Sequence, residues 1–355
     1  MSDIPLRLFV DCDTGLDDAL ALAFLGGSPE VELLAAGSVH GNVGSARAAQ
    51  NTRMVLARTG SAHVPVFQGA VRPLVPATPR ISARHAPDGL GGLSSSSVSG
   101  GETTGSGRAG CAEGLPDAHG GPGTLRAADT ASGRTASPHA AEQLVALARS
   151  CAAEGRPISI LAIGPLTNLA VALTLEPDLP SMVDRVVVMG GSFDQTSLLQ
   201  PMLPESNVRA DPEAAAAVLG AGLPLTLVPL DVTGTALLPP AVADRIALGG
   251  EVGSFCAQLA ERYAESYGSC STSPSCPLHD PLAAAVAVAP DLATFESVDV
   301  SVALCGSPRA TTSVSAIPAG TSEHARRGPQ VSAVSLVRSV DVGRFVEMFA
   351  GRVSR

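Results

Sequence analysis

Short apolar runs alternate with longer helical stretches through most of this chain. Six runs of strand length occur at residues 6–11, 31–39, 64–69, 158–164, 185–191 and 223–230. Helical stretches follow four of them, at residues 17–27, 45–60, 165–177 and 211–222. Strands that are apolar on both faces and separated by helices are typical of a parallel sheet that is covered on both sides.

The pattern changes after about residue 296. Strand-like runs at 298–305, 311–317 and 330–337 are followed by a last helical stretch at 342–352. They predict a small C-terminal β addition to the core. The expected fold class is therefore α/β: a mostly parallel Rossmann-like sheet with helices on both faces, plus this addition. In such sheets ligands bind beyond the carboxyl ends of the strands, so residues just after each run are candidates for a site.

Residues 91–137 interrupt the pattern, because 25 of these 47 residues are Gly, Ser or Thr and only four are Leu or Val. A segment with so little apolar surface cannot offset the entropy lost on ordering, which predicts a low-complexity, disordered insertion without catalytic residues. The whole chain has 355 residues, of which 45% are hydrophobic. We expect a single domain over residues 1–355.

The charge balance excludes several classes of function. The formal net charge is −10, from 23 basic and 33 acidic residues, whereas a nucleic-acid binder needs a basic face. A small-molecule partner is expected instead. Every basic residue is Arg, because the sequence contains no Lys. This excludes a Schiff-base lysine and the lysine of a phosphate-binding loop.

The seven Cys residues are scattered without a Cys-x-x-Cys pair, as expected in a reducing compartment. Cys270, Cys276 and His279 have poor spacing for a zinc site. The N-terminal sequence has only a short apolar run that ends in acids, unlike a signal peptide or a membrane span. We therefore expect a cytoplasmic protein without a membrane partner.

Four carboxylates follow the first predicted strand within eight residues. They are Asp11, Asp13, Asp17 and Asp18. Such a concentration of like charge is unfavourable unless a cation binds there, although aspartates in a solvated loop can also cap the following helix. His279 and Asp280 precede a second apolar helical run, where such a pair could again be a helix cap. Together the two clusters could form an oxygen-only site, which favours calcium or magnesium over zinc.

The order of motifs resembles that of the inosine-uridine nucleoside hydrolase family. The matching segments are DCDTGLDDALAL at 11–22, VHGN at 39–42, LAIGPLTNLA at 161–170, VVMGG at 187–191, PESN with VRADPEAA at 204–215 and LHDPLA at 278–283. The resemblance spans nearly the whole chain except the insertion, and it is weakest in the last sixty residues. It implies hydrolysis of the N-glycosidic bond of inosine- or uridine-like ribonucleosides to base and ribose, Ca²⁺ as cofactor, nucleoside salvage, and a homodimer or homotetramer.

The resemblance also implies roles for individual residues. It implies that the metal is held by the side chains of Asp13, Asp18 and Asp280 and the backbone carbonyl of Ile163. It implies that the ribose hydroxyls are bound by Asp17, Asn42, Glu205 and Asn207, with Met189 packing against the sugar. Asp11 stays a further candidate in the acidic run.

The chemistry of the bond suits these residue types. Cleavage between C1′ and nitrogen passes through an oxocarbenium-like transition state, which needs an anionic surrounding, an activated water and stabilisation of the departing base. Asp13 is the expected base that takes the proton of a calcium-bound water. His279 is expected to protonate the departing base, because the ordinary pKa of His lies near neutral pH.

Three further residues are candidates for the base-binding end. Tyr263 and Tyr267 lie four apart in a helical stretch, so their rings share one face, which serves either core packing or base binding. His85 stands where relatives carry a histidine on a mobile loop. The chain contains no Trp, so tandem-tryptophan stacking on a purine is not available.

Two departures from the family pattern and two alternatives remain. In the first departure, Leu199 replaces a usual Asn and Ser206 a usual Phe, so either the grip on the 5′-hydroxyl is weaker or Gln195 or Gln200 substitutes. The second departure is the segment SCSTSPSCP at 269–277, which is unlike the family pattern and could reposition His279. The FVDCDTG run also resembles a haloacid-dehalogenase-type phosphatase, but such an enzyme needs a phosphate-binding cation, normally Lys. The other alternative is a non-catalytic calcium- and nucleoside-binding homologue, which would bind nucleosides without hydrolysing them.

Overall fold

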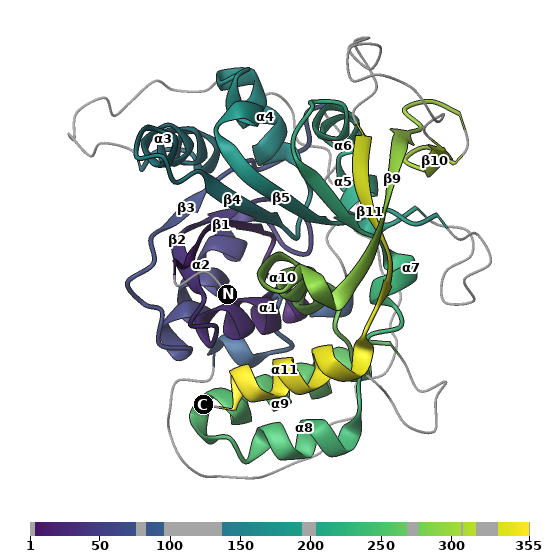
Figure 1. Cartoon of the computed structure of the whole chain (residues 1–355). Coiled ribbons are helices and arrows are strands. Elements are labelled where there is room, and N and C mark those ends of the chain that lie inside the picture. The colour runs from purple at the N-terminus through teal and green to yellow at the C-terminus, as the bar shows by residue number, and fades with distance from the viewer. Residues whose placement is uncertain are drawn as a thin grey trace, which may run out of the picture.

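A computed structural model describes residues 4–75, 83–95, 137–193, 204–267, 276–306, 308–316 and 333–354. Within these ranges nine strands form one sheet in the order β10-β9-β11-β6-β5-β4-β1-β2-β3 (Figure 1). They are β1 (Leu6–Cys12), β2 (Val31–Ser38), β3 (Val66–Gln68), β4 (Ile158–Ala162), β5 (Val183–Met189), β6 (Leu225–Val228), β9 (Ala293–Val302), β10 (Thr312–Ala316) and β11 (Ala333–Val340). A separate two-stranded ribbon joins β7 (Leu237–Leu238) and β8 (Cys276–Pro277).

The predicted mostly parallel sheet is confirmed. Strands β1 to β6 are all parallel to their neighbours, and β11 pairs in parallel with β6. The predicted C-terminal addition continues this sheet, because β9 pairs antiparallel with β11 and β10 pairs antiparallel with β9. The C-terminal strands therefore extend the central sheet at one edge.

Helices cover both faces of the sheet (Figure 1). One face carries α1 (Leu16–Gly26), α2 (Ser45–Arg58), α10 (His279–Val288) and α11 (Val342–Val353), with α8 (Pro240–Ala247) and α9 (Gly250–Ser266) packed beyond them. The other face carries α3 (Ala140–Ala153), α4 (Thr167–Leu175) and α6 (Pro212–Leu219). The short helices α5 (Ser206–Ala210) and α7 (Leu230–Thr233) follow the segments after β5 and β6.

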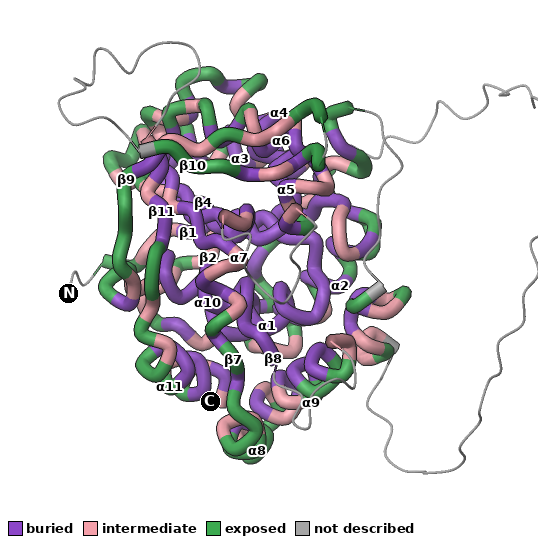
Figure 2. The backbone as a smooth tube through the Cα atoms, turned by 90° about the vertical axis from the view of Figure 1, so that its right-hand side faces the viewer, coloured by how far each residue is buried: buried purple, intermediate pink, exposed green. Residues whose placement is uncertain are grey.

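The central elements are buried on all sides (Figure 2). In β1, Leu8 and Val10 pack against the α1 face while Phe9 packs against the α3 and α4 face, as the alternation of side chains along a strand requires. Helix α1 is apolar all round because it lies between the sheet and α9, α10 and α11. Its first turn carries Asp17 and Asp18, so these two acids are placed inside the protein.

The strand order reverses direction at β1, which has β4 on one side and β2 on the other. This is the switch point at which open α/β sheets bind ligands. The segments that follow β1, β2, β4 and β5 at this edge begin at residues 13, 39, 163 and 190. Among the candidate site residues, Asp13, Asn42 and Ile163 lie in these segments.

The predicted insertion at 91–137 falls outside the described residues except for 91–95 and residue 137, so it stays a prediction.

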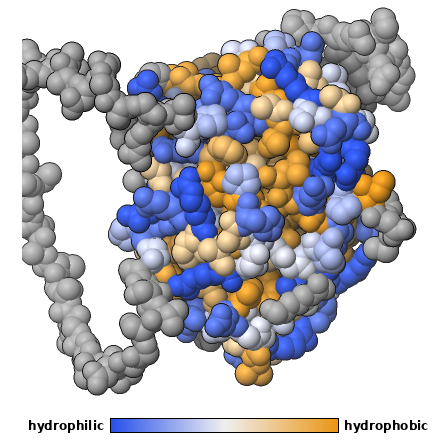
Figure 3. All heavy atoms as spheres, turned by 90° about the vertical axis from the view of Figure 1, so that its left-hand side faces the viewer, coloured by the Kyte–Doolittle hydropathy of each residue, from blue (hydrophilic) through white to orange (hydrophobic). Residues whose placement is uncertain are grey.

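Among the described residues, no helix is both long and apolar enough to span a membrane. The side of the molecule where β3 lies shows apolar residues interspersed with polar ones (Figure 3). Val71, Leu74 and Val75, which follow β3, are exposed apolar residues.

Candidate functional site

Three buried carboxylates meet where α1 and α10 begin. One oxygen from each of Asp17, Asp18 and Asp280 lies within 4.8 Å of the others. Asp18 and Asp280 are almost fully buried, and the two helices that carry them pack against each other. Residues more than 260 positions apart thus form one acidic cluster, as the sequence analysis expected of the two acidic segments.

Asp13 is bonded into this cluster through the VHGN segment. The backbone N–H of Asn42 donates to Asp13 Oδ2 at 2.5 Å, and the Asn42 side-chain amide donates to Asp18 Oδ2 at 3.2 Å. The backbone N–H of Asp13 donates to Asp18 Oδ1 at 3.2 Å. A Cβ atom at Gly41 would collide with the Asp13 carboxylate, so only glycine allows this approach.

The electrostatics of these acids reflect their burial. Burial, followed by repulsion from neighbouring acids, raises the pKa of Asp18 to about 7 and raises the pKa values of Asp13 and Asp280 well above the ordinary value. Asp17 Oδ1 is buried and has no hydrogen-bond partner in the described part of the chain. Such an oxygen suits a cation or a substrate hydroxyl, because a buried unpaired acceptor is costly.

Glu205 and Asn207, two of the candidate ribose residues, lie at the start of α5 and contact the ends of β4 and β5. The side-chain amide of Asn207 donates to the carbonyl oxygens of Ile163, at 3.0 Å, and Met189, at 3.2 Å. Glu205 caps α5, because its carboxylate accepts from the backbone N–H groups of Asn207 and Val208 at 2.7 and 3.0 Å. The Glu205 side chain also accepts from the N–H of Gly191 at 3.1 Å, which ties α5 to the end of β5.

A chain of hydrogen bonds connects the acidic cluster with His279. Tyr263 donates to Asp17 Oδ2 at 2.9 Å, and its hydroxyl lies 3.3 Å from that of Tyr267. The Tyr267 hydroxyl lies 2.9 Å from His279 Nε2, and His279 Nδ1 lies 2.8 Å from the hydroxyl of Thr233. Burial lowers the pKa of His279 to about 4, so the ring is neutral at neutral pH and does not have the near-neutral pKa expected of it from the sequence. The two tyrosines therefore form hydrogen bonds with polar residues of the site in addition to packing in the core.

His85 lies beside the same residues. Its Nδ1 accepts from the backbone N–H of Leu16 at 3.0 Å and lies 3.8 Å from Asp17 Oδ1. Its ring centroid is 5.4 Å from that of Tyr263. The segment around His85 is therefore joined to the start of α1.

Asp11 lies in a different hydrogen-bond network. Its Oδ1 accepts from the side-chain amide of Asn168 at 2.8 Å, and burial raises its pKa to about 7. Strand alternation explains this, because Asp11 lies on the same face of β1 as Phe9, toward α4. Asp11 supports the end of β1 from outside the cluster.

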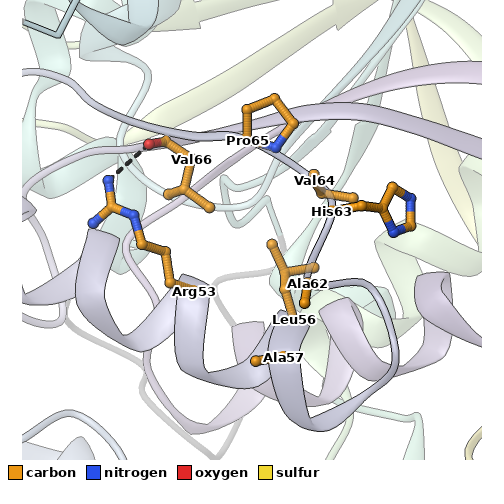
Figure 4. Close-up of a pocket in the computed structure, with 8 residues that line it drawn as sticks. All are labelled: Arg53, Leu56, Ala57, Ala62, His63, Val64, Pro65 and Val66. Carbon is orange, nitrogen blue, oxygen red and sulfur yellow. Dashed lines mark hydrogen bonds between the residues drawn. The ribbon is translucent and has the colours of Figure 1, made fainter.

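A cavity of about 300 Å³ elsewhere contains none of these residues. It lies between α2 and β3, and Arg53, one of its lining residues, donates to the carbonyl of Val66 at 2.7 Å (Figure 4). Its lining includes no carboxylate. The acidic cluster therefore stays the candidate site.

The family model of the inosine-uridine preferring nucleoside hydrolases matches residues 8–347. The chain belongs to this family. It is an N-glycosyl hydrolase that splits ribonucleosides into base and ribose. The chain is 33% identical over 311 residues to the inosine-uridine preferring nucleoside hydrolase of Leishmania major, covering 85% of each chain.

Other similar proteins are also nucleoside hydrolases by name. The non-specific ribonucleoside hydrolase RihC of Escherichia coli (strain SMS-3-5 / SECEC) is 29% identical, with 84% of each chain covered. Among solved structures, the purine-preferring ribonucleoside hydrolase from Gardnerella vaginalis superposes with a TM-score of 0.76 at 26% identity over 98% of each chain. Membership of this family removes the phosphatase alternative.

Some residues of this nucleoside hydrolase site were not predicted from the sequence. Thr233 lies 2.8 Å from His279 Nδ1, yet a lone Thr in the sequence does not indicate such a role. Outside the cluster, Asn168 likewise donates to Asp11 without a signal in the sequence. In the first departure from the family pattern, Leu199 lies outside the described residues, while the Ser206 hydroxyl donates to Glu205 Oε1 at 3.1 Å. The second departure, at 269–277, lies outside them except for residues 276 and 277. Cys270, weighed for zinc, also lies outside them.

Proposed function

We propose that this nucleoside hydrolase is calcium-dependent and acts on inosine- or uridine-like ribonucleosides. The observation that carries the proposal is the buried cluster of Asp17, Asp18 and Asp280, with Asp13 bonded to its edge. An oxygen-only donor set favours Ca²⁺ or Mg²⁺. Asp13, Asp18, Asp280 and the carbonyl of Ile163 would hold the ion, which when bound supplies a polarised water close to the ribose.

The protein's own residues would position the sugar and move protons. The unpaired oxygen of Asp17 suits a ribose hydroxyl, and Asn42, Glu205 and Asn207 supply further polar groups around it. Met189, at the end of β5, would pack against the sugar. Asp13 takes one proton from the attacking water, whose oxygen forms the new bond to C1′.

The other half of the reaction concerns the departing base. As the bond from C1′ to nitrogen breaks, its electron pair goes to the base nitrogen, which then takes a proton. The Tyr267 hydroxyl supplies this proton while the neutral His279 ring, 2.9 Å away, donates a hydrogen bond from Nε2 to the phenol oxygen, and solvent restores the proton. His279 therefore acts on the base through the Tyr267 hydroxyl, held in place by Thr233.

A substrate panel tests the proposed function. Free ribose is measured from inosine, uridine, cytidine, adenosine and guanosine, with and without chelator. Release from inosine or uridine in the presence of Ca²⁺ supports the proposal. Nucleoside binding without release from any substrate would support the non-catalytic homologue instead.

Removal of the metal should abolish activity and lower stability. Prolonged chelation is expected to stop ribose release, and added Ca²⁺ to restore it. Because a ligand that binds only the folded protein stabilises it by about 2.7 kcal/mol at 100 times its Kd, Ca²⁺ should also raise the Tm by several degrees. Asp280→Asn should lose this rise, whereas Asp244→Asn, a change at an exposed acid on α8, should keep it. Full activity of metal-free protein would contradict the proposed cofactor.

The biological setting is proposed on the family resemblance. We propose a cytoplasmic enzyme of nucleoside salvage that forms a homodimer or homotetramer. Light scattering on the purified full chain distinguishes these states from a monomer.

A further inference from the structure

We propose that Arg84 is a positioning residue for the departing base: its cation holds the Tyr267 ring and stabilises negative charge on the Tyr267 oxygen as the base leaves. The Arg84 guanidinium carbon lies 4.7 Å from the centroid of the Tyr267 ring. The hydroxyl of that ring lies 2.9 Å from His279 Nε2. The inference rests on the proposed function, because it assigns Arg84 to the same site.

The short turn that carries Arg84 is anchored to the site. Arg84 lies in a 3-10 turn, η1 (Ala83–His85), next to His85, whose ring contacts the backbone of Leu16 and the ring of Tyr263. One turn thus places an imidazole against Tyr263 and a guanidinium against Tyr267. A cation over an aromatic ring is a favourable contact of defined geometry.

The charged groups around Tyr267 shift its pKa in opposite directions. The pKa of Tyr267 is raised to about 12, mainly by burial and also by the charge of Asp17, while the hydrogen bond with Tyr263 and the charge of Arg84 act to lower it. The neutral groups near it are Tyr263, His279 and the buried thiol of Cys276. Within the described part of the chain, Arg84 is therefore a cation that opposes the acidic cluster at this end of the site.

This placement matters most while the base departs. When Tyr267 gives its proton to the base nitrogen, negative charge develops on the phenol oxygen, and a cation over the ring attracts a phenolate more strongly than a phenol. An interaction that strengthens in the transition state raises kcat more than it lowers KM. A leaving group that departs without a proton would gain nothing from it.

The test compares two substrates and three variants of the full chain with Ca²⁺. Arg84→Met is expected to lower kcat for inosine by roughly 3- to 30-fold, while kcat for p-nitrophenyl riboside changes less than about twofold. Arg84→Lys, which keeps a cation, should restore most of the loss. Arg58→Met removes a matched contact, 4.8 Å from the Phe255 ring centroid, and should change neither rate.

The outcomes separate this inference from the proposed function. Equal losses on both substrates, no loss on inosine, or a Lys variant no better than Met would each overturn the role of Arg84. A wild-type enzyme that releases no ribose from any nucleoside would overturn the proposed function first. Melting temperatures of all variants show whether a loss comes from unfolding.

Discussion

Asp13→Ala is expected to lower kcat for inosine by more than the roughly 10²–10⁴-fold typical of losing one acid-base group. The reason is that Asp13 is proposed both to hold the metal and to take the proton of the attacking water. It also orders its neighbours, because its carboxylate accepts from the backbone of Asn42, whose side chain reaches Asp18. Ribose release under saturating nucleoside and Ca²⁺ measures the loss.

Two further variants test whether the charge of Asp13 is needed and whether the effect is specific to this acid. Asp13→Asn keeps the size of the side chain but removes its charge, so it should lose nearly as much activity. Asp11→Asn changes a buried acid two residues away that faces Asn168, and its loss should be much smaller. A near-normal rate for Asp13→Ala in correctly folded protein would reassign the base.

The fold could be predicted because its strands and helices differ clearly in pattern. Runs such as 6–11 and 158–164 are apolar on both faces, and the structure places them as β1 and β4 in the middle of the sheet. Which edge the C-terminal strands join could not be predicted, since it depends on pairing between β11 and β6, more than a hundred residues apart. Strand pairing of that kind leaves no local signal.

The site could be predicted only in part from residue types. An acidic run after a buried strand favours a cation, but the meeting of Asp280 with Asp18 depends on how α10 packs on α1. Asp11 lies within β1 and faces Asn168, whereas Asp13 lies beyond the strand end and is bonded to Asp18, although the two acids are neighbours in the sequence. The contacts of Thr233 with His279 and of Arg84 with Tyr267 could not be predicted from the sequence, because neither residue type indicates its partner.

His279→Ala is expected to slow inosine hydrolysis by roughly 10²–10⁴-fold, the usual span for a general acid, while p-nitrophenyl riboside is affected much less. A natural base departs poorly as an anion and depends on a proton donor, whereas p-nitrophenolate leaves readily without one. The structure adds that the Tyr267 hydroxyl lies 2.9 Å from His279 Nε2, and we propose that His279 acts on the base through this hydroxyl. Tyr267→Phe should therefore show the same dependence on the leaving group.

The double variant decides whether the two residues act as one unit. If His279 and Tyr267 work along a single hydrogen-bonded path, the double variant should lose little more than the worse single variant, because residues of one unit are strongly non-additive. The measured quantity is the ratio of the kcat losses on inosine and p-nitrophenyl riboside. If His279→Ala lowers kcat equally on both substrates, His279 acts on the metal or the ribose instead, by orienting its neighbour Asp280. Solvent or another group would then have to protonate the base.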